Sequence, residues 1–232
     1  MAHYFGMRKK GEIRLHQFRV GILASLLVAG PSSAPRAGGA VAVRPPNEIE
    51  FSATVHASRF DCWIMPGYHA IVWKDGGAAS HALLVADASD VEVLDALERL
   101  NARPGDNLSM DAWERRKDRK SAAPDAVVEG PDVDILLRLP GQAGLVPLSS
   151  VLEDPGGRGV AMRFGGNRAN SRKWMSGCIA CLYSCPGSKV GNAKYTVRDY
   201  VEDTTRFRVR EGALPPDGTR IGVVLRLVSK KS

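Results

Sequence analysis

Three cysteines stand within eight residues of one another in the segment Met175-Ser-Gly-Cys178-Ile-Ala-Cys181-Leu-Tyr-Ser-Cys185-Pro186-Gly187. Their spacing, C-x2-C-x3-C-P, matches the last three cysteines and the proline of the bacterial ferredoxin run C-x2-C-x2-C-x3-C-P. Met175 occupies the position of the missing first cysteine. Thiolates are soft donors, and three of them this close together can surround one metal centre. The pattern therefore predicts a thiolate site at Cys178, Cys181 and Cys185.

The residues around this segment leave three kinds of site open. In the first, the three cysteines hold an iron–sulfur cluster, with Cys62 or an external group as the fourth ligand. In the second, the three cysteines and Met175 bind a soft ion such as Cu(I), which suits an oxidising compartment. In the third, the four cysteines of the chain form two structural disulfides and bind no metal. We favour the iron–sulfur cluster, and we expect Cys62 to lie near the other cysteines if the site has four thiolates.

Two histidines could also contribute a metal site. His69 and His81 flank the pair Asp75-Gly76 at similar distances, so they could face each other across a hairpin. We interpret them instead as polar residues at strand ends. Since no Ser-His-Asp set, HExxH motif or Walker-type loop can be assigned, no catalytic residue is proposed. A non-enzymatic electron-transfer or metal-binding protein is favoured over an enzyme.

The N-terminal part of the chain has the order of a secretory signal. Residues 1–19 are basic, residues 20–29 form an apolar run, and small residues and prolines follow as far as Ala40-Val41-Ala42. The apolar run is shorter than the about 20 residues that span a bilayer. We therefore predict a signal and processing region over residues 1–42 and a single exported, periplasmic domain over residues 43–232. No integral membrane segment is expected after signal removal.

The charge of the chain gives little support to a nucleic-acid partner. The formal net charge is +7, but the first 40 residues hold six basic residues and one acidic residue. The remaining 26 basic and 24 acidic residues leave a nearly neutral body. Such a body lacks the basic footprint that nucleic-acid binding requires. Hydrophobic residues make up 44% of the chain, which is enough for a globular core.

The local patterns predict a strand-rich domain with a good helix. Residues 48–57 alternate as a half-buried strand does. The apolar runs 69–73 and 81–85 are joined by Lys74-Asp75-Gly76-Gly77, which favours a tight hairpin turn. Residues 89–101 predict a helix, because Ser89 and Glu92 form a capping box before an apolar face.

Further strands are expected at residues 134–139, 145–148, 195–201, 207–209 and 221–228. The expected fold class is α+β, with mostly antiparallel strands, one clear helix at about 89–101 and a cysteine-bearing loop.

The cysteine segment and its surroundings resemble the YdjY-type domain. The residues that carry the resemblance are Phe164-Gly-Gly-Asn167, the run from Ser176 to Gly187, Val190-Gly-Asn192 and Tyr195-Thr-Val197. It extends more loosely to His81-Ala-Leu-Leu-Val85 and covers most of residues 50–228. Proteins of this type are exported and called ferredoxin-like, so the resemblance implies a thiolate site at the three cysteines. It implies no settled reaction.

Together these observations predict an exported, thiolate-centred protein that binds an iron–sulfur or other soft-metal centre for electron transfer. Its partner would be a redox protein or another exported protein. The alternatives are a disulfide-stapled structural or partner-binding module and a periplasmic copper-binding protein. The export prediction weighs against the cluster, since clusters are assembled in the cytoplasm and an unfolded export route would lose them.

Overall fold

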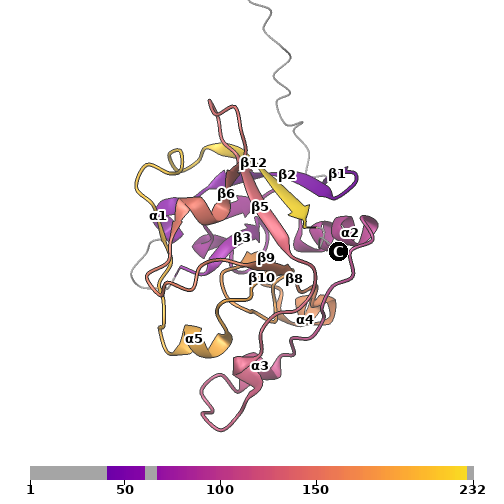
Figure 1. Ribbon diagram of the computed structural model, residues 1–232, viewed down its shortest axis with the longest axis vertical. Helices are drawn as coiled ribbons and strands as arrows, with labels where there is room; N and C mark the ends of the chain where they lie inside the picture. Colours follow the sequence, from indigo (N-terminus) through magenta and orange to yellow (C-terminus); the bar gives the residue numbers. More distant parts are fainter. Residues whose placement is uncertain (1–40, 61–66, 229–232) are drawn as a thin grey trace, which may run out of the picture. The chain divides into compact units, whose positions relative to one another are not determined.

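The computed structural model describes residues 41–60 and 67–228, which are built around one large sheet (Figure 1). Its strands are β1 (Ala42–Arg44), β2 (Glu48–Val55), β3 (His69–Trp73), β4 (Leu84–Ala86), β5 (Val133–Arg138), β6 (Val146–Pro147), β8 (Met162–Phe164), β9 (Cys178–Cys181), β10 (Val190–Asn192) and β12 (Arg220–Leu227). Their order is β6-β5-β12-β2-β4-β3-β9-β10-β8, and β1 pairs with β2. The short strands β7 (Leu152–Glu153) and β11 (Arg208–Val209) form a separate pair.

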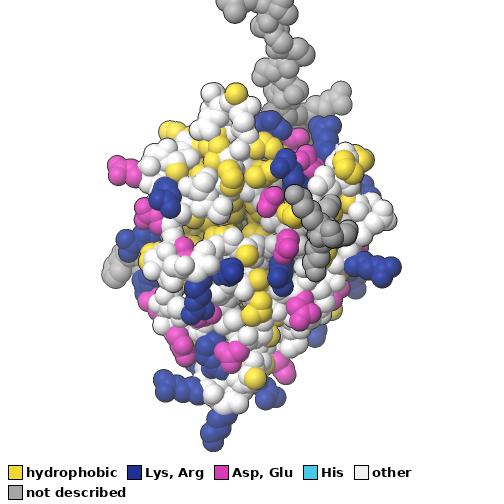
Figure 2. Space-filling view, viewed as in Figure 1, with side chains coloured by type: hydrophobic (Ala, Val, Ile, Leu, Met, Phe, Trp, Pro, Cys, Tyr) yellow, Lys and Arg dark blue, Asp and Glu magenta, His cyan; other side chains and the backbone are white. Residues whose placement is uncertain are grey.

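The sheet curls into a half-barrel, because its last strand returns towards β5. Asp132 and Arg163 form an isolated bridge, and the Phe164 amide donates to the Pro131 carbonyl at 2.8 Å. Beyond this point β5 and β8 diverge around a cavity of about 500 Å³, whose apolar lining includes Val133, Ile135, Leu148, Val160 and Met162. Apolar side chains accordingly gather in the middle of the face shown in Figure 2. The main hydrophobic core lies inside the curl.

Within residues 41–60 and 67–228 the α-helices are α1 (Ala57–Phe60), α2 (Asp90–Arg99), α3 (Asp111–Glu114), α4 (Arg168–Trp174) and α5 (Val197–Val201). The prediction of α2 is confirmed. Ser89 is its N-cap and forms the expected capping box, with the Glu92 amide donating to the Ser89 hydroxyl at 3.1 Å. Its side chains Leu94 and Leu97 are buried in the core. Among the residues that the structure describes, no helix is both long and apolar enough to cross a membrane.

The expected fold class is right in being strand-rich with a good helix, and its details differ from the structure. The sheet is mixed: most strand pairs are antiparallel, but β3 pairs in parallel with β4 and β9 pairs in parallel with β10. The described residues also contain more helices than the one expected. The cysteine-bearing loop is corrected as well, because Cys178 and Cys181 lie in strand β9 and Cys185 follows it.

The predicted hairpin around Asp75-Gly76 is wrong. The two strands run parallel, and His81 lies in a 3-10 turn before β4. The connection instead docks on the segment before β9, where the Gly77 amide donates to the Met175 carbonyl at 3.1 Å. A Cβ atom on Gly76 would lie 2.5 Å from the Ser176 carbonyl oxygen, so this close approach requires glycine.

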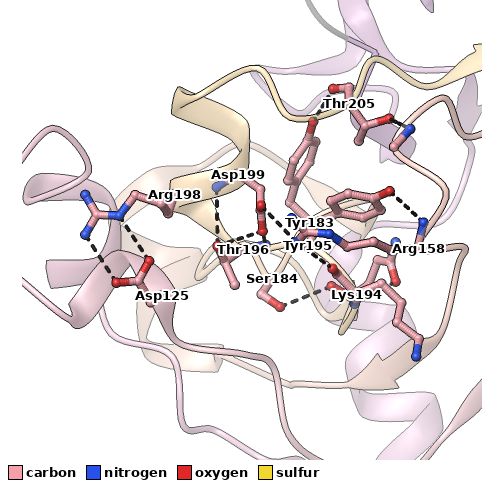
Figure 3. Close-up of polar contacts among 12 residues, drawn as sticks. Asp125, Arg158, Tyr183, Ser184, Lys194, Tyr195, Thr196, Arg198, Asp199 and Thr205 are labelled. Atoms are coloured by element: carbon pink, nitrogen blue, oxygen red, sulfur yellow. Dashed lines mark hydrogen bonds and ion pairs between the residues drawn. The ribbon is translucent and has the colours of Figure 1, made fainter. Parts of the chain in front are cut away.

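The predicted strand at residues 195–201 is also wrong, because most of it forms helix α5. A second capping box starts this helix: the Thr196 amide donates to Asp199 at 2.9 Å and the Asp199 amide donates to the Thr196 hydroxyl at 3.3 Å (Figure 3). These reciprocal bonds satisfy the first free amides of the helix. They outweigh the strand preference of Tyr195 and Val197.

One carboxylate fixes the glycine-rich loop that precedes β8. Asp154 accepts hydrogen bonds from the Tyr195 hydroxyl at 2.7 Å, the Thr205 hydroxyl at 2.9 Å, and the Gly156 and Gly159 amides at 3.1 and 2.6 Å. Burial raises the pKa of Asp154, but these hydrogen bonds outweigh it and hold the pKa below its ordinary value.

Changing Asp154→Asn is expected to lower the free energy of unfolding at pH 7 by about 2 kcal/mol, the scale of a hydrogen bond to a charged group. Because the folded pKa of Asp154 is depressed, its stabilisation is complete only above the unfolded pKa of about 3.9. It disappears as the pH falls through the folded pKa. Urea unfolding at pH 7 and at lower pH, with the exposed neighbour Glu153→Gln as control, measures this. An equal loss at both pH values would contradict it.

Candidate metal centre

Irregular pairing between β3 and β9 places Cys178 and Cys181 on one face of the sheet. Residues three apart in a regular strand point to opposite faces. Here the pairs are His69 with Cys181, Ile71 with Ala180, and Val72 with Cys178, so the register shifts twice. Such bulges redirect side chains. As a result, the two residues between the cysteines belong to the main core, while both cysteines join a separate cluster.

His69 completes this arrangement. The ligand atoms of His69, Cys178 and Cys181 all lie within 4.8 Å of one another, and the Cys178 sulfur is 3.5 Å from His69 Nδ1. Both cysteines are fully buried, and His69 is only 8% exposed. Two thiolates bound to one zinc ion at about 2.3 Å can be no more than about 4.6 Å apart. The three donors are therefore nearly as close together as the ligands of a single ion.

Cys185 lies beside these donors and is partly exposed. It packs against the cluster formed by Val72, Ala82, Cys178 and Cys181. Hydrogen bonding with the Cys181 thiol, followed by burial, raises the pKa of Cys185. Cys178, Cys181 and Cys185 are all free of disulfide bonds.

Hydrogen bonds from the neighbouring residues hold the turn that carries Cys185 in place. The Cys185 amide donates to the Tyr183 carbonyl at 2.8 Å, and the Ser184 hydroxyl donates to the Asn192 carbonyl at 3.1 Å. The Tyr183 hydroxyl donates to the Thr205 carbonyl at 2.8 Å (Figure 3). These contacts fix the turn relative to the neighbouring strand β10, so Cys185 has a defined place next to the buried donors.

Burial sets the protonation of the donors. It raises the pKa of the Cys181 thiol well above its ordinary value and lowers the pKa of His69 to about 4. The imidazole is therefore neutral near pH 7, which is the form that binds metals. A thiol with a raised pKa is a poor nucleophile, because the thiolate is the reactive species. The arrangement suits metal binding, in which the ion displaces the thiol protons, better than covalent catalysis.

Aromatic rings form the outer wall of the site. The Tyr68 ring lies 4.0 Å from the His69 ring and 4.7 Å from the Tyr200 ring, measured between centroids. Burial raises the pKa of the Tyr68 hydroxyl, and the neighbouring Cys181 adds to the shift. Tyr68 is therefore protonated at neutral pH and shields the buried donors as a neutral side chain.

The structure places Cys178 and Cys181 in one buried cluster, against which Cys185 packs. Met175 is placed differently: its side chain is 75% exposed at the end of α4. Cys62 lies outside the described residues, as does the predicted signal region as far as residue 40. His69 was considered as a metal ligand only in a pair with His81 across the predicted hairpin, and it was interpreted instead as a polar residue at a strand end. Its position in an otherwise apolar run was the available signal.

These features define a curled, strand-rich domain with a buried cysteine–histidine cluster on the face opposite its main core. The YdjY domain model matches residues 45–226. The chain is also similar to the "Uncharacterized protein YdjY" of Escherichia coli (strain K12), with 31% identity over 160 residues, or 68% of this chain and 67% of that protein. No solved structure matches it significantly. The chain therefore belongs to the YdjY domain family.

Proposed function

We propose that this protein is an exported metal-binding protein whose centre holds one soft ion, Cu(I), between Cys178, Cys181 and His69. The observation that carries the proposal is the convergence of two sulfurs and one imidazole within 4.8 Å in a buried site. Soft sulfur donors select ions such as Cu(I) and zinc. The proposal keeps the predicted exported location, where the partner would be another metal-carrying or redox protein.

The number of converging donors favours Cu(I) over zinc. Structural zinc sites are almost always four-coordinate, and zinc sites with three protein ligands keep a water molecule in the fourth position. Here the three donors are closed in by the apolar side chains of Val72 and Ala82. An ion that is satisfied by three soft donors fits this environment better than one that needs bound water. Zinc would instead require Cys185 to move in as a fourth ligand.

Metal titration of anaerobically purified, reduced protein tests the proposal. We expect one Cu(I) per chain in competition with the chromophoric chelator bicinchoninate, and loss of this binding in the variant Cys178→Ser. The variant Met175→Leu should bind normally, because Met175 is exposed. Failure of the wild-type protein to take Cu(I), or a stronger one-to-one preference for zinc in the same competition format, would refute the assignment.

An iron–sulfur electron-transfer centre is the second candidate, favoured by the C-x2-C-x3-C-P spacing of the cysteines. His69 could then supply a fourth ligand, since histidine replaces cysteine in some clusters. A brown protein with iron and acid-labile sulfide near one cluster per chain would support it. Colourless, iron-free protein isolated anaerobically from its own compartment would exclude it.

A further inference from the structure

The cysteines at the proposed centre differ in how deeply the residues are buried. Cys178 and Cys181 are fully buried, whereas Cys185 is partly exposed. Cys185 nevertheless packs against the same cluster, together with Ala78 and Ala79 of the connection between β3 and β4. Cys185 is therefore the one cysteine among the described residues that contacts both the surface and the buried donors.

This difference in burial determines which cysteine an incoming ion can reach first. A soft ion moves between proteins by ligand exchange, in which a new metal–sulfur bond forms before the old one breaks. A carrier at the surface cannot contact the buried sulfurs of Cys178 and Cys181. It can contact Cys185, which packs against the buried cluster that contains Cys181.

We propose that Cys185 is the hand-over ligand of the centre, receiving Cu(I) from a thiolate- or thioether-held carrier and passing it inward to Cys181. This inference rests on the proposed function. In the first exchange a bond forms between Cu(I) and the Cys185 sulfur, a carrier bond to Cu(I) breaks, and the Cys185 proton passes to the carrier or to solvent. In the second exchange the Cys181 sulfur binds Cu(I) and releases its proton. The bond between Cu(I) and the Cys185 sulfur then breaks, and the Cys185 thiolate is reprotonated. The ion stays Cu(I) throughout, so no oxidant or reductant is needed.

Met175 is the competing candidate for this role. Its thioether is a soft donor on an exposed side chain, and its carbonyl accepts a hydrogen bond from the Gly77 amide in the connection that leads to Ala78. However, Cys185 is packed within the cluster itself, whereas Met175 reaches this connection through its backbone. Met175→Leu is therefore the matched control for Cys185→Ser.

Stopped-flow transfer of Cu(I) from its coloured bicinchoninate complex to reduced full-length protein tests the role of Cys185. Cys185→Ser should slow the transfer about tenfold or more, equivalent to a barrier raised by about 1.4 kcal/mol. The Cys185→Ser variant should nevertheless reach the same final Cu(I) occupancy as the wild-type protein. Met175→Leu should transfer at the wild-type rate.

The other possible results of this experiment would overturn either the inference or the proposed function. Wild-type transfer rates in Cys185→Ser would overturn the inference, and so would an equal slowing in Met175→Leu. A lower final occupancy in Cys185→Ser would make Cys185 a resident ligand and would overturn it too. If the wild-type protein takes no Cu(I) at all, the proposed function itself fails, which is a different result.

Discussion

Replacing His69 by leucine is expected to weaken Cu(I) binding by more than about 100-fold, beyond the about 10–100-fold typical of a lost outer-shell partner. The imidazole is the third donor of the buried cluster and is neutral near pH 7, so its loss leaves two sulfurs. Leucine has a similar size and is apolar. The free energy of unfolding of the metal-free protein should therefore change by less than about 1.5 kcal/mol.

His81→Leu is the matched control for this prediction. His81 is exposed in the 3-10 turn before β4, and it is the residue with which the hairpin hypothesis paired His69. Chelator competition should give wild-type affinity for His81→Leu, and urea unfolding should show that both variants remain folded. If His69→Leu binds Cu(I) as tightly as the wild-type protein, His69 is a packing residue and not a ligand.

The parts of this structure that sequence could predict depend on residues close together in the chain. The capping box of Ser89 and Glu92 lies within one turn of helix, so its pattern is sufficient to predict α2. The three cysteines are likewise near neighbours, and their grouping follows from their spacing. The equivalent pair Thr196 and Asp199 carried the same kind of signal for α5. It was hidden by side chains that favour strands.

The remaining parts depend on contacts between distant residues. His69 reaches Cys178 across 109 residues of sequence, and only the two register shifts between β3 and β9 turn the relevant side chains to one face. A shift of one residue reverses the direction of every side chain in a strand, and the local pattern does not show where such a shift occurs. The connection between the parallel strands β3 and β4 also depends on a distant contact, because Gly76 docks against Ser176.

Replacing Asp90 by alanine is expected to lower the free energy of unfolding by about 3–5 kcal/mol, the cost of leaving a buried charge without its partner. Lys189 Nζ lies 2.6 Å from the Asp90 carboxylate and donates to the Gly187 carbonyl at 3.3 Å. Lys189 is 0% exposed, and Asp90 is 7% exposed at the start of α2. Denaturant unfolding at neutral pH measures the loss.

The two partners of this ion pair should not be equivalent. Lys189→Met removes the fully buried charge and leaves Asp90 near the helix N-terminus, where the helix dipole stabilises a carboxylate, so its loss should be smaller. The double variant should be more stable than Asp90→Ala alone, because no unpaired ammonium remains in the interior. Asp203→Ala, which breaks the half-exposed pair with Arg206, should have little effect. Additive losses in the double variant would show that packing, not charge pairing, makes Asp90 important. Lys189 also joins the N-terminus of α2 to the turn after Cys185, since it pairs with Asp90 and donates to the Gly187 carbonyl. The ion pair that stabilises the fold therefore also holds the turn that follows Cys185.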